Sequence, residues 1–357
     1  KIQAPQIAVP LMEIFHKSTD QEVLLECSKA IGNIDDLQTL DVLTHLFQNS
    51  EKRKNWYEFL RLRKKYSPSS SFKNVLLKGD LYLKYSCLQY LFGKDNTQIT
   101  ELLQELLNFS PSVELKLLSI RCMKDLPNED ILANLCSQYG HNDDLDQAII
   151  GEIGFRKSKE HMDLVLEALS SKNPMITIQS ISALGRLGQP ESLPILLDVL
   201  EKAENANVTA TVMQQLGIFD NPLSTEALMQ ALYSPIGRIR ANAIESLMKL
   251  GKVEALSRIE RLLSDDNNRV RANAALACLK FGKKRAFKSL VDMSQSPNKW
   301  MRLSCLWALH VSGIVESRNV IAGLLNDPDY DVIMASVNFL KKIKKRNDNQ
   351  CISKNIT

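Results

Sequence analysis

Histidine and cysteine are the side chains best suited to hold metal ions or act as nucleophiles. The sequence contains five histidines and seven cysteines. One adjacent pair, Glu160-His161, has the carboxylate and imidazole that a divalent metal ion needs. It occurs once, and no further ligand lies at the spacing of a metal site. His141 stands close to Asp143 and Asp144 in a segment that we interpret as a polar turn. We therefore predict neither a metal site nor a bound cofactor.

Motifs that position a nucleophile or a phosphate group are absent from the sequence, which contains no GxSxG, GxGxxG or GxxxxGKS/T segment. The seven cysteines form no CxxC pair, and an odd number of scattered cysteines suggests reduced thiols in a cytosol-like compartment. We predict a cytoplasmic protein that has no catalytic residues, and a small-molecule substrate is not expected.

Membrane anchoring finds no support within the sequence itself. No apolar run approaches the roughly 18 residues that span a bilayer, and no signal peptide is recognisable. The sequence begins with Lys1 and not with Met. Membrane association through a segment preceding Lys1 therefore stays open as an alternative.

Basic and aromatic side chains are interleaved in residues 52–65, which contain seven lysines or arginines and one glutamate. Trp56, Arg61 and Arg63 belong to this stretch. Such a composition suits phosphate backbones, anionic lipid head groups or an acidic partner protein. The alternative is an exposed helix whose aromatic side chains pack inward while its charges are solvated.

Charge is unevenly distributed along the chain, whose overall net charge is only +4. Residues 238–302 hold fifteen basic and six acidic side chains, a net charge of +9, whereas residues 124–170 hold four and ten, a net charge of −6. This asymmetry favours electrostatic selection of a partner over indiscriminate binding to polyanions.

The elements that must position these side chains are repeats. The segment RIRANAIESLMKLG at 238–251 returns 31 residues later as RVRANAALACLKFG at 269–282. The same step leads from Arg240 to Arg271 and Arg302. Weaker copies extend back to about residue 20, which gives about ten units of roughly 31 residues.

Each unit has the spacing of a helix pair. Ile239, Ala243 and Leu247 form one apolar stripe at helical spacing, and a small residue recurs where Ala243 stands. A second apolar run precedes each such helix, and turns rich in Asp, Asn, Ser and Pro join the two. A lone pair cannot bury its apolar face, whereas a stack of pairs can, so the sequence predicts an all-α solenoid.

The repeat resembles the HEAT repeat in its short, PBS-lyase-like variety. A turn Asp is followed by Val-Arg-x-x-Ala-x-x-x-Leu and then Gly, and the residues that carry the likeness are Asp265, Asp266, Val270, Arg271, Ala274 and Gly282. The resemblance implies a right-handed α-solenoid of about ten stacked antiparallel helix pairs. It also implies that an arginine such as Arg271 pairs with a turn acid, here Asp265 or Asp266.

We expect three regions: a divergent N-terminal helical region at 1–80 with an insertion at 48–80, the solenoid at 81–345 and a polar tail at 346–357. HEAT-like proteins serve mainly as binding scaffolds, so we predict a non-enzymatic scaffold or adaptor that binds a protein partner on its concave face. Nucleic-acid binding through residues 238–302 and 52–65 is the alternative. The predicted contacts are Arg240, Asn242, Glu245, Lys249, Arg271, Asn273, Lys280, Arg302, Trp307 and His310, with Trp56, Arg61 and Arg63 in the insertion.

Two enzymatic alternatives follow from the resemblance. HEAT-like alkylpurine DNA glycosylases use Trp, Arg and Asp around a damaged nucleotide, and Trp300, Arg302 and Trp307 lie close together here without a matching Asp. HEAT-like metal-dependent hydroxylases repeat His-Glu pairs, whereas Glu160-His161 is single and reversed. Neither pattern is complete, so we predict a protein that is not an enzyme.

Overall fold

The computed structural model describes residues 8–32, 103–108, 110, 112–123 and 129–354. Every regular element in these residues is a helix, and the chain divides into two compact units, residues 1–156 and 157–357. The predicted all-α solenoid is confirmed. The predicted insertion at 48–80, with Trp56, Arg61 and Arg63, and the predicted boundary after residue 80 lie outside the described residues.

The described helices of the first unit form two groups. Helix α1 packs against α2, and helix α10 packs against α8 and α9. Ile149, Ile150 and Ile153 of α10 are fully buried in these contacts. The bounds are α1 Ala8–Lys17, α2 Gln21–Gly32, α8 Val113–Met123, α9 Glu129–Cys136 and α10 Asp143–Arg156.

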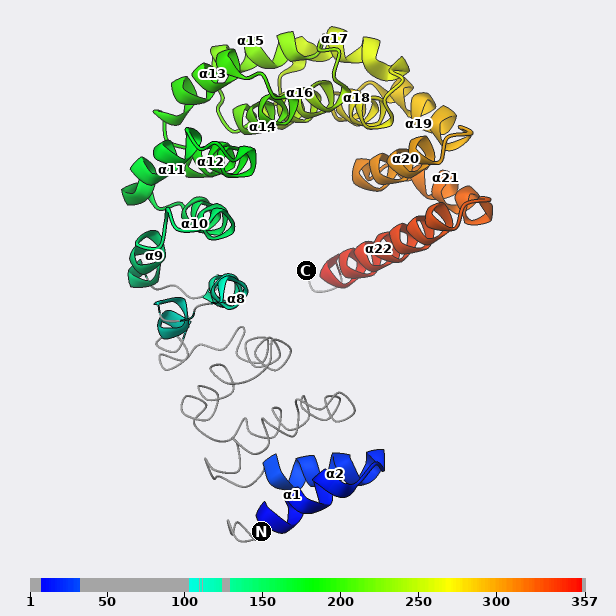
Figure 1. The fold of residues 1–357 in the computed structure, drawn as a ribbon. Helices are drawn as coiled ribbons and strands as arrows, with labels where there is room; N and C mark the ends of the chain where they lie inside the picture. Colours follow the sequence, from blue (N-terminus) through cyan, green and yellow to red (C-terminus); the bar gives the residue numbers. More distant parts are fainter. Residues whose placement is uncertain (1–7, 33–102, 109, 111, 124–128, 355–357) are drawn as a thin grey trace. The chain divides into compact units, whose positions relative to one another are not determined.

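The second unit alternates between an outer and an inner row of helices, as Figure 1 shows for α13 to α20. The inner helices pack side by side, each against the next, and every outer helix packs against the inner helix that follows it. The outer helices are α11 Met162–Leu169, α13 Ser192–Lys202, α15 Pro222–Ala231, α17 Leu256–Arg261, α19 Phe287–Ser294 and α21 Ser317–Gly323. The inner helices are α12 Pro174–Leu187, α14 Ala206–Leu216, α16 Gly237–Lys249, α18 Asn268–Lys280, α20 Lys299–Ser312 and α22 Tyr330–Lys354.

Short 3₁₀ segments extend several of the outer helices. Helix α17 is only six residues long and is flanked by such turns at Val253–Ala255 and Leu262–Ser264. The others are Lys159–His161, Lys284–Ala286 and Leu324–Asn326. Helix α22 runs to Lys354, so most of the predicted polar tail at 346–357 is helical. Among the described helices, none combines the length and the apolar character that crossing a bilayer requires.

Asparagine caps four of the inner helices, α12, α14, α18 and α20, as the polar turns predicted, whereas α16 begins after Ile236 without a side-chain cap. The side chain of Asn267 accepts hydrogen bonds from the backbone N–H groups of Arg269 and Val270. Such a cap satisfies helix donors that would otherwise lack a partner and typically contributes about 1 kcal/mol. Equivalent caps are Asn173 on α12, Asn205 on α14 and Asn298 on α20.

The core lies between the two rows, along the predicted stripe. Ala243 and Leu247 have no exposed surface, and Ile239 is 6% exposed. The recurring small position of Ala243 is held by Cys305 in α20, which is also fully buried and donates a hydrogen bond from Sγ to the Leu290 carbonyl at 2.9 Å. A small side chain at this position lets the inner helix approach its outer partner closely.

The glycine that recurs every 31 residues ends an inner helix. Gly282 follows α18 with φ of 86°, a left-handed conformation that L side chains rarely adopt. Gly251 and Gly313 repeat it with φ of 69° and 67°. The chain must turn here toward the next outer helix, and glycine takes this conformation without the steric cost of a Cβ atom.

Candidate partner-binding groove

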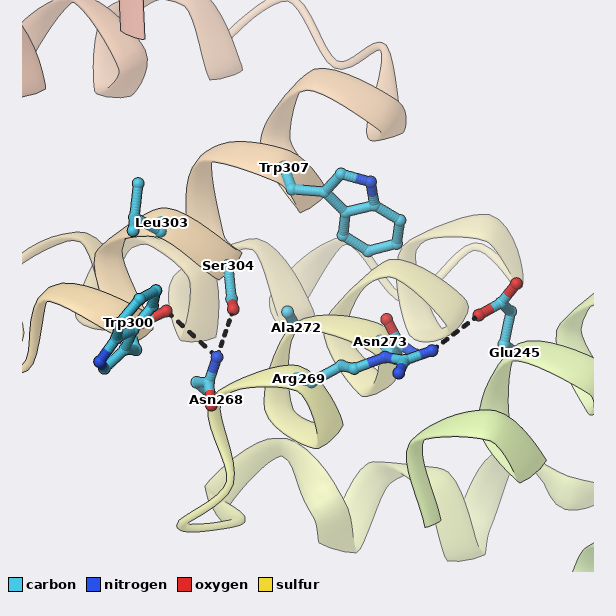
Figure 2. Close-up of a pocket in the computed structure, with 9 residues that line it drawn as sticks. All are labelled: Glu245, Asn268, Arg269, Ala272, Asn273, Trp300, Leu303, Ser304 and Trp307. Atoms are coloured by element: carbon cyan, nitrogen blue, oxygen red, sulfur yellow. Dashed lines mark hydrogen bonds and ion pairs between the residues drawn. The ribbon is translucent and has the colours of Figure 1, made fainter. Parts of the chain in front are cut away.

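A groove of about 450 Å³ opens where the inner helices α16, α18 and α20 lie side by side (Figure 2). Its floor comes from α18, and its two sides come from α16 and α20. The lining residues are Glu245, Asn268, Arg269, Ala272, Asn273, Trp300, Leu303, Ser304 and Trp307.

Two tryptophans of α20 dominate the groove. They lie seven residues apart, which puts both on the same face of the helix. Trp300 is 58% exposed and Trp307 is 39% exposed, although indole is among the side chains that gain most from burial. In the repeat, Trp300 stands where Arg238 and Arg269 stand. Both indoles thus present apolar surface that this chain leaves open to solvent.

Hydrogen bonds between neighbouring helices hold the polar wall of the groove. Asn268 donates from Nδ2 to Ser304 Oγ at 2.6 Å and to the Trp300 carbonyl at 3.3 Å (Figure 2). Arg269 lies 3.6 Å from Glu245 and donates to the Asn242 side chain at 2.9 Å. These contacts connect α18 to α20 and to α16 across the groove.

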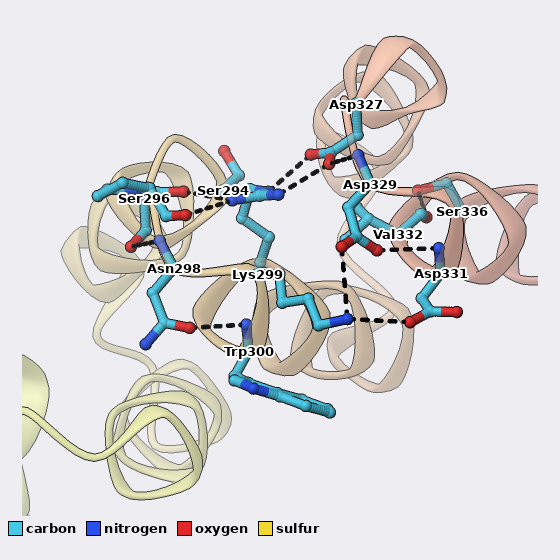
Figure 3. A network of polar contacts seen from close by, with 12 residues as sticks. Ser294, Ser296, Asn298, Lys299, Trp300, Asp327, Asp329, Asp331, Val332 and Ser336 are labelled. Carbon is cyan, nitrogen blue, oxygen red and sulfur yellow. Dashed lines mark hydrogen bonds and ion pairs between the residues drawn. The ribbon is translucent and has the colours of Figure 1, made fainter.

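An ammonium group lies against the indole at the rim. Lys299 Nζ is 5.1 Å from the centroid of the Trp300 ring. It also lies 3.2 Å from Asp331 and 3.4 Å from Asp329 (Figure 3). The hydrogen bond to Asp331, and next the one to Asp329, raise the pKa of Lys299 above its ordinary value. The charge beside Trp300 is therefore positive throughout the physiological pH range.

The structure brings three of the predicted contacts into the groove: Glu245, Asn273 and Trp307. Lys249 lies beside it and binds Glu245 at 3.1 Å. The other two solvent-side predictions are elsewhere. Lys280 lines a second hollow of about 340 Å³ with Leu279 and Val311, and His310 stacks on Phe339 with ring centroids 4.7 Å apart.

The remaining predicted contacts among the described residues are engaged inside the solenoid. Arg240 and Arg302 form ion pairs with Asp265 and Asp327. Arg271 donates to the carbonyls of its own turn. Asn242 is 4% exposed and donates to the Ala210 carbonyl. Internal hydrogen bonds occupy these side chains, so they do not belong to the groove.

Asn268, Arg269 and Ser304 line the groove but are not among the contacts predicted from the sequence. Trp300, which departs from the repeat, is not in that set either. A signal was present in the repeat. Arg238, Arg269 and Trp300 share one position, and Trp300 and Trp307 share one helix face. Taken together, these two relationships point to the groove.

The metal and nucleotide alternatives find no assembled site among the residues that the structure describes. His161 makes a hydrogen-bonding contact from Nδ1 to Ser158 Oγ at 2.9 Å. No group of three His, Cys, Asp or Glu side chains there could hold a metal ion. Arg302, which the glycosylase alternative requires near a nucleotide, is 8% exposed and bound to Asp327.

Comparison with known proteins identifies the repeat. A family model of HEAT repeats matches the chain three times, at residues 140–217, 194–280 and 225–310. No curated protein sequence matches the chain.

Solved structures similar to this chain include the complex of CpcE and CpcF of phycocyanin lyase from Nostoc sp. PCC7120, at 18% identity and a TM-score of 0.42 over 59% of this chain and 94% of that one. Human deoxyhypusine hydroxylase is 15% identical, with a TM-score of 0.33 over 70% of this chain and 96% of that one. Kap95p, known from a structure with RanGDP, is 12% identical, with a TM-score of 0.48 over 95% of this chain and 55% of that one. These values are too low to transfer an activity or a partner.

Proposed function

The chain is a HEAT-repeat protein over residues 140–310, and from this premise we propose that it is a non-enzymatic scaffold that binds a segment of a partner protein in the groove between α16, α18 and α20. Trp300 and Trp307 are the anchors of this interface. Glu245, Asn268 and Arg269 supply its polar rim.

The observation that carries the proposal is the pair of exposed tryptophans in one hollow. Trp300 and Trp307 are 58% and 39% exposed. Removing apolar surface from water contributes roughly 25 cal/mol per Å², so a partner that covers the two rings gains a substantial part of its binding free energy there. Tryptophan is enriched among the interface residues that contribute most to binding.

Preorganisation supports the same function. The two anchors come from one helix, and the bonds from Asn268 to Ser304 and to the Trp300 carbonyl tie α18 to α20. A groove on rigid helices loses little conformational entropy when it is filled. Glu245 and Arg269 are each partly exposed, with 28% and 50% of their side-chain surface accessible. They can therefore exchange their mutual contact for hydrogen bonds to a bound polypeptide.

Nucleic-acid binding is the second candidate, because residues 238–302 carry a net charge of +9. Much of this positive charge faces carboxylates of the chain itself. Arg240, Lys252 and Arg302 form ion pairs with Asp265, Asp220 and Asp327. Such cations release few counterions on binding a phosphate backbone, which weakens the electrostatic part of nucleic-acid affinity. The protein partner is therefore the better-supported proposal.

A selection of peptides from a random displayed library against the full chain tests the proposal. We expect the selected peptides to lose about tenfold or more in affinity for Trp307→Ala and for Trp300→Ala, which corresponds to about 1.4 kcal/mol or more for each anchor. Tyr330→Ala is the matched control, because Tyr330 is an aromatic residue that is 71% exposed and does not line the groove.

Unchanged affinity of the selected peptides for the Trp300→Ala/Trp307→Ala double variant would contradict the proposal. Binding of random duplex DNA supplies the other arm. An affinity that is measurable at low salt and falls steeply as salt is added would favour the nucleic-acid candidate instead.

A further inference from the structure

Arginines of the inner helices form a ladder that links successive repeats. Arg240 donates from Nε and Nη2 to the two carboxylate oxygens of Asp265, at 2.9 and 2.8 Å. Arg302 does the same with Asp327, at 2.7 and 2.9 Å. In both rungs the acid lies 25 residues after the arginine, in the turn of the next repeat. These two rungs tie α16 and α20 each to the turn that follows one repeat later.

One rung of this ladder lacks its acid. Arg271 is the arginine between Arg240 and Arg302, and the residue 25 positions after it is Ser296. Arg271 instead turns its Nε to the Asp265 carbonyl at 2.8 Å and its Nη2 to the Ser264 carbonyl at 3.3 Å. No carboxylate of the residues that the structure describes pairs with Arg271. Its guanidinium group binds these backbone carbonyls and is partly exposed to solvent.

Ser296 keeps the structural role of the missing acid within its own turn. Its Oγ accepts a hydrogen bond from the backbone N–H of Asn298 at 3.2 Å (Figure 3). The Oδ1 atom of Asp327 accepts the equivalent bond from the N–H of Asp329 at 2.9 Å. The serine oxygen thus stands in the place of a carboxylate oxygen, and only the negative charge and the second oxygen are absent.

The rung one repeat before that of Arg240 shows that the acid and the arginine can be lost together. There the arginine position is held by Thr209 and the acid position by Ser234, so neither charge is present. In the rung of Arg271 and Ser296, the arginine is present but the position of the acid is held by a serine. This combination makes the site distinct among the aligned units of the described solenoid.

We propose that Ser296 is a phosphorylation site and that its phosphate group completes the ladder by binding Arg271. A phosphoserine supplies about −1.5 to −2 charges and three acceptor oxygens, and arginine binds such groups in a bidentate manner. Ser296 is partly exposed in the turn between α19 and α20, and the exposed Pro297 follows it. This Ser-Pro dipeptide matches the preference of proline-directed protein kinases.

The transfer balances with a nucleoside triphosphate as the donor. The Oγ atom of Ser296 attacks the γ-phosphorus, the bond from that phosphorus to the β-phosphate oxygen breaks, and the nucleoside diphosphate leaves. The hydroxyl proton passes to the general base of the protein kinase. Neither Ser296 nor Arg271 lines the groove, so this site is independent of the proposed partner-binding function.

Charge-mimicking variants of the full chain test the geometry. We expect Ser296→Asp to raise the midpoint of thermal unfolding by about 2–4 °C, since one ion pair is added to a unit of this size. Ser296→Asn is the matched control, because it has the same shape without the charge, and it should leave the midpoint unchanged. The gain from Ser296→Asp should vanish in an Arg271→Gln background and fall in Arg271→Lys, which folds with its charge but cannot bind in a bidentate manner.

Phosphorylation itself is tested by incubating the full chain with a proline-directed protein kinase and ATP, followed by peptide mapping. We expect a phosphate on Ser296 and a rise of the unfolding midpoint that Arg271→Gln abolishes. Absence of phosphate from Ser296 would overturn the proposal. A phosphate there whose effect on the midpoint is the same with and without Arg271 would overturn it as well.

Discussion

Asp327 accepts two hydrogen bonds from the guanidinium group of Arg302, which precedes it by 25 residues, with Nε–Oδ2 and Nη2–Oδ1 distances of 2.7 and 2.9 Å. Only 9% of the Arg302 side chain and 3% of the Asp327 side chain are exposed. Arg302 also donates to the carbonyls of Ser296 and Pro297. One side chain thereby joins three segments: helix α20, the turn before it and the turn of the following repeat.

The first prediction concerns the stability of this rung. Asp327→Asn leaves the buried Arg302 without a counter-charge, and we expect the free energy of unfolding to fall by about 3 kcal/mol. Denaturant titration of the full chain, followed by circular dichroism, measures the change. Asp331→Asn is the control, because Asp331 is 65% exposed in its pair with Lys299 and should lose at most about 1 kcal/mol. Equal losses in the two variants would contradict a special role for the rung.

The second prediction concerns the loss of stability at low pH. Burial by itself raises the pKa of the Asp327 carboxyl, but the hydrogen bonds from Arg302 and the N–H of Asp329, with the positive charge of Arg302, outweigh it and lower the pKa. A lowered pKa in the folded state stabilises the protein above the unfolded pKa of about 4 and ceases to do so as the pH falls through the folded value.

Asp327→Asn should therefore reduce the dependence of stability on pH below about 4, while the stability difference between variant and parent should stay constant above about pH 5. Thermal unfolding midpoints measured from pH 3 to pH 7 check this. A difference that grows between pH 5 and pH 7 would show that another titrating group is responsible.

The third prediction concerns thiol reactivity. Burial raises the pKa of Cys305 to about 12, and burial with the nearby Glu260 charge raises that of Cys278 to about 12. At pH 8 only about one thiol in ten thousand is then the reactive thiolate. Iodoacetamide should label both cysteines far more slowly in the native chain than in denaturant, as measured by peptide mass spectrometry. Labelling of Cys305 at the same rate in both states would refute the close packing of α20 against α19.

Sequence alone was enough to determine the repeat and the helices. The stripe of Ile239, Ala243 and Leu247 and the recurring glycine after each inner helix are local patterns. Helical periodicity and a left-handed turn depend on residues within about a dozen positions, so they can be read without the neighbouring repeats. The HEAT resemblance rests on the same repeating pattern, among its residues Val270, Ala274 and Gly282.

Only the tertiary structure decided which contacts the polar and aromatic side chains make. From the sequence, Arg271 was expected to pair with Asp265 or Asp266, yet the Asp265 carboxylate binds Arg240 and Arg271 receives only the Asp265 carbonyl. Likewise, the sequence predicted both Asn242 and Trp307 as solvent-side contacts. Asn242 is buried against α14, whereas Trp307 lines the groove. Lateral stacking sets the distance and rotation between neighbouring repeats. The residue types 25 positions apart do not specify this distance and rotation. Only the folded solenoid therefore shows which charges pair and which indoles are exposed.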